Sequence, residues 1–311
     1  MEGWLKNVIR FRRLAPVPLN SWLVDQGIPH THQRYRLRVW REVHGALGPL
    51  RDDLIAYVQE ALDDARRRIR SGFQDDLSPF NDPAHDPAAH YPAMLNRISL
   101  QGYLGETLGV LAVEHFGAVG HADWMVPALL FRFHDQEFQH LDLINERVLA
   151  GEAHEPDAEK EKRPGRTGDD GLAFRIDANG VITDILTLEA KCLTVSNTGI
   201  MKDAHEKLMV GGNRPSGVRE LINLLTEYDT PEAQAWQQAL LQFYRDGFRT
   251  AARHDGLAYA VGHSPKQPAD RIAWLPPEAP HSAYTMQRNL EAMEFQFENL
   301  DAVVDILYRG A

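Results

Sequence analysis

One stretch of the chain, residues 169–193 (DDGLAFRIDANGVITDILTLEAKCL), constrains its fold more than any other. Apolar residues dominate 172–176 and 181–193, which predicts two strands. Asn179-Gly180 between them is the dipeptide that favours a tight turn between antiparallel strands. The second strand is apolar on both faces. We therefore expect it in the middle of a sheet, covered on both sides.

Two charged residues interrupt this second strand. Glu189 and Lys191 are two residues apart, so they project from the same face, with Cα atoms about 6.5–7 Å apart. Burying a carboxylate and an ammonium costs several kcal/mol unless they are paired or bound to a metal. Both a functional site and a plain ion pair near the end of a strand account for them.

Two further carboxylates precede the first strand. Asp169 and Asp170 stand just before Gly171, and a hairpin brings the start of its first strand close to the end of its second. One of them is therefore expected beside Glu189. Carboxylates of this kind suit Mg²⁺, although Asp and Gly also favour ordinary turns. The sequence leaves open which Asp is the ligand.

The arrangement Asp170…Glu189-Ala190-Lys191 resembles the motif of the PD-(D/E)xK nuclease superfamily. The resemblance covers roughly residues 99–210, and Asp169 stands where the family often has Pro. It implies a restriction-endonuclease-like α/β (mixed α+β) fold. That fold has a central mixed sheet flanked by helices, here preceded by a helical N-terminal segment.

The resemblance also implies roles for individual residues. Asp170, Glu189 and the backbone carbonyl of Ala190 would hold Mg²⁺ or Mn²⁺, with Asp169 as the alternative Asp. Lys191 would orient a water molecule or stabilise the phosphate charge. Glu106 matches the Glu that family members often carry on the preceding helix. The alternative for Glu106 is a solvent-facing residue, and the long segment between it and Asp170 departs from the family pattern.

The function that follows from the resemblance is metal-dependent hydrolysis of phosphodiester bonds, with DNA as the expected substrate. The expected setting is prokaryotic defence against foreign DNA, beside a helicase or ATPase partner. The chain has no NTP-binding loop of its own. Two alternatives are a silent nuclease-like module that binds nucleic acid or protein, and a helical metal protein. The latter rests on Glu137-x-x-His140 alone, whereas such bundles use two copies of this motif.

Charge is distributed unevenly along the chain. It has 33 Lys and Arg against 44 Asp and Glu, a net charge of −11, yet residues 1–72 carry 13 against 8 and are net positive. A helix predicted over 50–69 leads into the arginine cluster Arg66, Arg67, Arg68 and Arg70. This helix is either a solvated amphipathic helix or a phosphate-binding surface. Lys202, on a later predicted helix, is a further candidate for contact with nucleic acid.

The chain divides into two expected parts. Residues 1–92 form a mainly helical basic segment that ends in a linker rich in Pro and Asp, and 93–311 form the nuclease-like domain with a C-terminal extension. Further helices are predicted at 99–116, 135–149, 198–210, 217–252 and 302–308, strands at 124–133, 257–261 and 292–297, and a charged loop at 151–168.

A single cysteine, Cys192, excludes a disulfide scaffold and any cage of cysteine ligands. By strand alternation it points away from Glu189, which places it in the core. No run of about 18 apolar residues predicts a membrane span. The first residues lack the features of a secretory signal, and we therefore expect a cytoplasmic protein.

Overall fold

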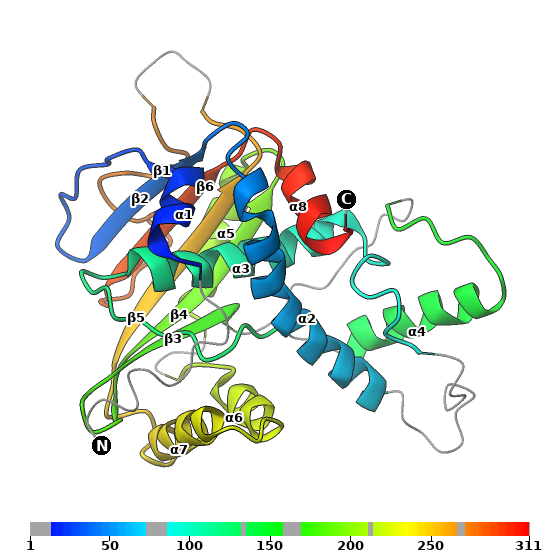
Figure 1. The fold of residues 1–311 in the computed structure, drawn as a ribbon. Helices are drawn as coiled ribbons and strands as arrows, with labels where there is room; N and C mark the ends of the chain where they lie inside the picture. The colour runs from blue at the N-terminus through cyan, green and yellow to red at the C-terminus, as the bar shows by residue number, and fades with distance from the viewer. Residues whose placement is uncertain are drawn as a thin grey trace.

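Six strands form one mixed sheet in the order β1-β2-β6-β5-β4-β3 (Figure 1). The computed structural model describes residues 14–72, 86–131, 135–157, 169–210, 214–265 and 271–310. The four central strands pair in parallel, and β1 and β3 close the two edges in antiparallel pairs. The strands are β1 Leu23–Asp25, β2 Tyr35–Glu42, β3 Gly171–Ile176, β4 Ile182–Leu193, β5 Ala252–Val261 and β6 Leu290–Gln296. The predicted α/β class with a central mixed sheet is thus confirmed.

The N-terminal part of the chain contributes to this sheet as well as to the helices. Helices α1 (Pro16–Trp22) and α2 (Arg51–Gly72) agree with a helical segment, but β2 lies between them and pairs with β6. The sequence analysis predicted no strand here. The sequence of β2 does not look like a buried strand because it contains charged residues. Arg38 is nevertheless buried, since its Nε lies 2.6 Å from the Glu291 carboxylate.

One face of the sheet is covered by α1, α2, α3 (Arg97–Phe116) and α8 (Leu300–Tyr308), which share an apolar core with β4, β5 and β6. Asn96 caps α3 by accepting a hydrogen bond from the Ser99 N–H. Glycines let α3 approach the strands closely: a Cβ built at Gly109 would lie 2.9 Å from the Ala258 Cβ. This helix therefore packs directly on β4 and β5.

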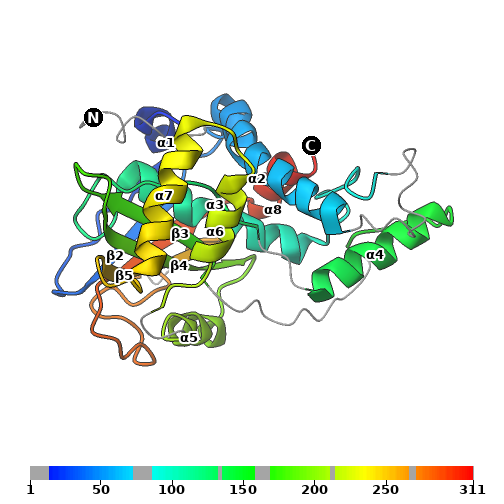
Figure 2. The same cartoon turned by 90° about the horizontal axis from the view of Figure 1, so that it is seen from below.

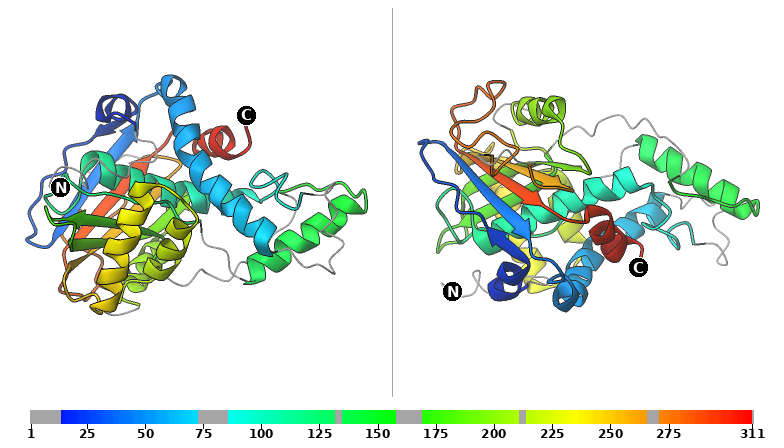
Figure 3. Two further views of the ribbon diagram at one scale, coloured as in Figure 1. Left: turned by 60° about the horizontal axis from the view of Figure 1, so that its bottom comes forward. Right: turned by 90° about the horizontal axis from the view of Figure 1, so that it is seen from above.

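The opposite face is covered by α5 (Thr198–Lys207), α6 (Val218–Thr226) and α7 (Pro231–Arg245). Helices α6 and α7 pack on β3 and β4, while α5 packs near β5, β6 and β2. Figure 2 shows α6 and α7 over the β3–β4 end. The right-hand view of Figure 3 shows the sheet between α5 on one side and α1, α2 and α8 on the other. Helix α4 (Asp135–Leu149) extends away from the sheet (Figure 1).

Most predicted elements are confirmed, and two differ. The 217–252 region forms two helices because α6 ends at Thr226 and Thr230 caps a new helix that starts with Pro231. The 124–133 region forms no strand through Phe131; Met125 makes only an isolated bridge with Phe174. The linker residues 73–85 and the loop residues 158–168 lie outside the described part of the chain.

Candidate active site on the β3–β4 hairpin

The register of the β3–β4 hairpin brings the predicted acidic residues together. Gly171 lies opposite Leu188, so the preceding Asp170 lies opposite Glu189. The Asp170 N–H donates to the Leu188 carbonyl over 2.7 Å, which extends the pairing by one residue. The Asp170 carboxylate in turn accepts the Ala190 N–H over 2.8 Å. Asp170 is therefore held by the backbone on both sides of Glu189.

Glu189 is the most buried member of this group, with 3% of its surface exposed. Its Oε1 accepts a hydrogen bond from the Lys191 Nζ and lies 3.4 Å from the Lys207 Nζ on α5. The Lys191 Nζ also donates to the Ala190 carbonyl over 3.3 Å. Two ammonium groups from different elements thus converge on one buried carboxylate.

Burial and the neighbouring Asp170 carboxylate raise the pKa of Glu189 to about 7, although Lys191 and Lys207 oppose the shift. For Lys191, burial alone would lower the pKa, but attraction to Glu189 and Asp170 outweighs it and raises the pKa. Lys191 is therefore a cation at neutral pH. A buried carboxylate that titrates near neutrality beside a fixed cation is typical of functional sites.

Asp169 points to a different set of partners. Its Oδ2 accepts hydrogen bonds from the Ser216 N–H and hydroxyl over 2.6 and 3.0 Å, and its Oδ1 lies 3.6 Å from Arg253. Ser216 immediately precedes α6, so Asp169 ties the start of β3 to that helix. The charge of Asp170 acts on Glu189.

Glu106 is buried in α3, with 6% of its surface exposed, and so is not the solvent-facing residue that the sequence allowed. The preceding Gly105 packs against the Cβ atoms of Ala190 and Cys192, on the face of β4 opposite to Glu189. The charge of Glu106 acts on the buried Tyr308 hydroxyl. Its contribution to a shared site stays a prediction.

The arginine cluster on α2 is largely matched by acidic partners of the chain. Arg66 pairs with Asp63 at 2.7 Å, Arg67 contacts Asp64 and Glu227, and Arg70 pairs with Asp86 at 2.6 Å. Lys202 on α5 is exposed and lies 3.4 Å from Glu206 in the next turn. The net positive charge of the first 72 residues therefore overstates the charge that this helix offers to phosphates.

Sequence reasoning missed Lys207 and Arg253. The signal for Lys207 was available, because Met201, Ala204 and Leu208 form the buried stripe of α5 and Lys207 flanks that stripe. Arg253 could not be found locally. It reaches Asp169 from β5, a strand that starts more than 80 residues later.

The donor chemistry of the hairpin fits a hard divalent cation. Asp170, Glu189 and the Ala190 carbonyl are all oxygen donors, the type that Mg²⁺ and Mn²⁺ take. Across the described ranges, however, no three His, Cys, Asp or Glu side chains gather into a metal-binding group. The residues thus offer two carboxylates and one carbonyl, with lysines next to one of the carboxylates.

No protein-family model matches the chain, and no curated protein matches it either. Within the part of the chain that the structure describes, no helix combines the length and the apolar character needed to cross a membrane. The geometry of the hairpin and the residues around it are therefore what point to a function.

Proposed function

We propose that the chain is a metal-dependent nuclease of the PD-(D/E)xK type that hydrolyses phosphodiester bonds, with DNA as its substrate. The observation that carries the proposal is the pairing of Asp170 with Glu189 across the hairpin, with Lys191 on the same face. Burying two carboxylates and an ammonium in one sheet is costly unless they are paired or bound to a metal.

Asp170, Glu189 and the Ala190 carbonyl would hold Mg²⁺ or Mn²⁺. The bound ion would supply Lewis-acid polarisation of the phosphate and a water molecule of lowered pKa. The Ala190 N–H keeps the Asp170 carboxylate aligned beside Glu189. Lys191 is cationic and would stabilise negative charge that develops on the phosphate. Lys207 adds a second positive group over the same carboxylate.

A second candidate is a nuclease-like module that binds nucleic acid or a partner protein without cleaving it. It is favoured by the two lysines on Glu189 and by the lack of a third acidic or imidazole ligand among the described residues. In such a module the ammonium groups would compensate permanently for the buried carboxylate, and no metal would be needed.

The test is to incubate the purified chain with linear double-stranded DNA, single-stranded DNA and RNA in Mg²⁺, Mn²⁺ or EDTA. The nuclease proposal predicts cleavage of DNA that requires a divalent ion and is lost in Glu189→Gln. Binding without cleavage in every metal would support the silent module instead. Because a role in cytoplasmic host defence with a helicase or ATPase partner is part of the proposal, the panel is repeated with candidate partner proteins.

A further inference from the structure

A pocket of about 560 Å³ opens at the ends of β2 and β6 where the loops 26–34 and 280–289 meet. Its volume lies within the range of about 300–1,000 Å³ typical of small-molecule sites. Eleven residues line it, and none of them is Asp or Glu. Two arginines, Arg34 and Arg288, belong to the lining. The chemistry of the walls therefore favours an anionic ligand.

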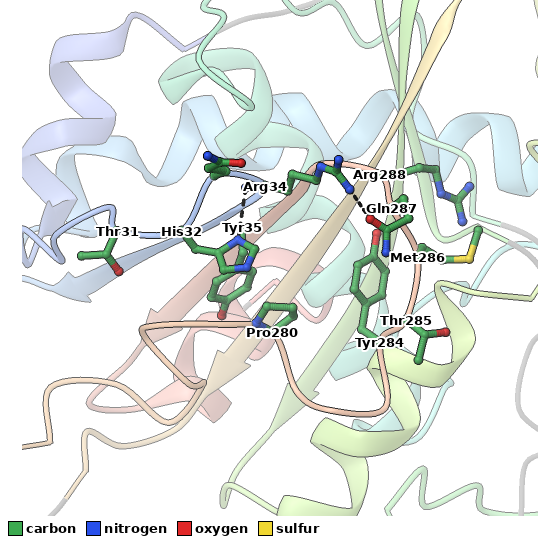
Figure 4. A pocket seen from close by; sticks show the side chains of 11 residues that line it. Thr31, His32, Arg34, Tyr35, Pro280, Tyr284, Thr285, Met286, Gln287 and Arg288 are labelled. Carbon is green, nitrogen blue, oxygen red and sulfur yellow. Dashed lines mark hydrogen bonds between the residues drawn. The ribbon is translucent and has the colours of Figure 1, made fainter.

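Aromatic side chains stand on both sides of the pocket. Figure 4 shows His32 and Tyr35 on one side and Tyr284 on the other, with the Arg34 side chain extending to Gln287. Both tyrosine hydroxyls are engaged elsewhere, since Tyr35 donates to the Pro276 carbonyl over 2.7 Å and Tyr284 donates to Asp255 over 2.6 Å. The two tyrosine rings are thus fixed and buried, with 2% and 8% of their surface exposed, so the half-buried His32 is the aromatic side chain most open to a ligand.

The two arginines differ in what they can offer a ligand. Arg288 lies 3.1 Å from the buried Asp255 carboxylate and also donates to the Leu208 carbonyl, so much of its charge is balanced. Arg34 is exposed and its guanidinium donates to the neutral amide of Gln287. No carboxylate in the described part of the chain forms an ion pair with Arg34. It can therefore supply the charge that an anion requires.

We propose that this pocket binds a nucleoside monophosphate group, with the phosphate on Arg34 and the base against His32. A guanidinium matches phosphate oxygens in pairs, and aromatic side chains accept any base by stacking. The shared chemistry covers a free nucleotide and the phosphorylated end of a nucleic-acid strand. None of the residues that line the pocket belongs to the hairpin site.

Strand β5 connects the surroundings of the pocket with the hairpin site. Asp255, the partner of Tyr284 and Arg288, precedes by two residues the Leu257 that pairs with Glu189. Two residues span about 7 Å along a strand. A nucleic-acid strand whose phosphorylated end is bound in the pocket would continue from there toward the hairpin. This anchoring role rests on the proposed nuclease function, whereas binding of the nucleotide group does not.

The test is fluorescence anisotropy in EDTA, so that no cleavage intervenes. The probes are a labelled oligonucleotide with a 5′-phosphate, with a 3′-phosphate or with neither, and deoxyadenosine monophosphate is the competitor. We expect at least about tenfold tighter binding with a terminal phosphate, or competition by the free nucleotide if that is the ligand. Arg34→Ala should remove the preference. Arg245→Ala, an exposed arginine of α7 outside the lining, should keep it.

Two results would overturn the proposal: equal binding of all three oligonucleotides with no competition by the nucleotide, or an undiminished phosphate preference in Arg34→Ala. Glu189→Gln separates this proposal from the nuclease proposal. It should bind the phosphorylated ligand as the wild type does, whether or not the wild type proves to cleave DNA.

Discussion

The two faces of β4 differ in packing and in charge, although their residues alternate along one strand. Leu188, Ala190 and Cys192 face α3, where glycines bring the helix against the strand and the contacts are apolar. Glu189 and Lys191 face the other way, toward Asp170 and Lys207. One face is packed as a core, whereas the other gathers charge under partial burial.

This difference shows how a single strand can separate stability from chemistry. On the α3 face, close packing leaves little room for change, and burial of Cys192 raises the pKa of its thiol, which keeps it unreactive. On the other face, burial raises the pKa of Glu189 and the lysines oppose that shift. Substitutions on the two faces should therefore have different consequences.

The largest expected effect is on metal binding by the charged face. Asp170→Asn and Glu189→Gln should each weaken Mn²⁺ binding by more than about 100-fold, because even the residues that only support metal ligands typically contribute 10–100-fold. Isothermal titration calorimetry measures this affinity. Cys192→Ala, on the apolar face, is the matched control and should bind Mn²⁺ normally. Equal affinity in all the variants would remove these carboxylates from the site.

The next effect concerns stability and the apolar face. Gly109→Ala should destabilise the fold, because its Cβ would lie 2.9 Å from the Ala258 Cβ and overpacking costs about 1–3 kcal/mol. Gly102→Ala is the control on the same helix. No atom lies within 4 Å of its added Cβ, so it should gain up to about 1 kcal/mol of helix propensity. Urea unfolding compares the two, and similar midpoints would contradict the close packing of α3.

A smaller effect is expected for Lys207, the cation that α5 contributes. Its side chain is partly exposed and lies 3.4 Å from Glu189. Glu189 keeps Lys191 as a second cationic partner, and solvent at the lysine end brings the pair toward the value of about 1 kcal/mol of an exposed one. Lys207→Ala should therefore lower the rate of cleavage by no more than about fivefold, in single-turnover assays. A loss as large as that of a metal ligand would instead assign Lys207 a role in the chemistry.

The smallest effect on stability is expected for Asp157, an exposed residue that lies beside the start of α3. Asp157 accepts the Arg97 N–H at the start of α3 and pairs with Arg309, which together lower its pKa to about 2. Because the folded pKa is depressed, the stabilisation is present above the ordinary value of 3.8 and is lost as the pH falls toward 2.

Asp157→Asn should therefore cost less than about 1 kcal/mol at neutral pH, since Asp157 is exposed and solvent screens the pair. The difference from the wild type should shrink below about pH 3. Urea unfolding at the two pH values measures it. A difference that grows on acidification would reverse the assigned sign.

The hairpin and its charged face could be predicted from the sequence because the signals are local. Asn179-Gly180 predicts the turn, and the alternation of a strand then predicts that Glu189 and Lys191 share a face while Cys192 does not. The length of the hairpin then predicts that one of Asp169 and Asp170 lies beside Glu189. These features need only the periodicity of a strand and the length of the hairpin.

The rest of the fold depends on partners that are distant in sequence. The charged residues of β2 suggest a polar segment. The structure shows why they can be buried: Glu291, some 250 residues later, lies beside Arg38. Likewise Asp169 could be separated from Asp170 only once Ser216 and Arg253 were seen at its carboxylate. By contrast, two acidic partners of the α2 arginines are local, because Asp63 and Asp64 stand three residues before Arg66 and Arg67.

The central claim is that the charged face of β4 performs metal-dependent phosphodiester hydrolysis. The most direct measurement is the single-turnover rate of DNA cleavage in Mg²⁺ by Lys191→Met, beside the wild type and Cys192→Ala. The account predicts a loss of about 100–1,000-fold for Lys191→Met, the size expected when one charge-stabilising donor is removed, and a normal rate for Cys192→Ala. Cleavage by Lys191→Met at the wild-type rate would contradict it.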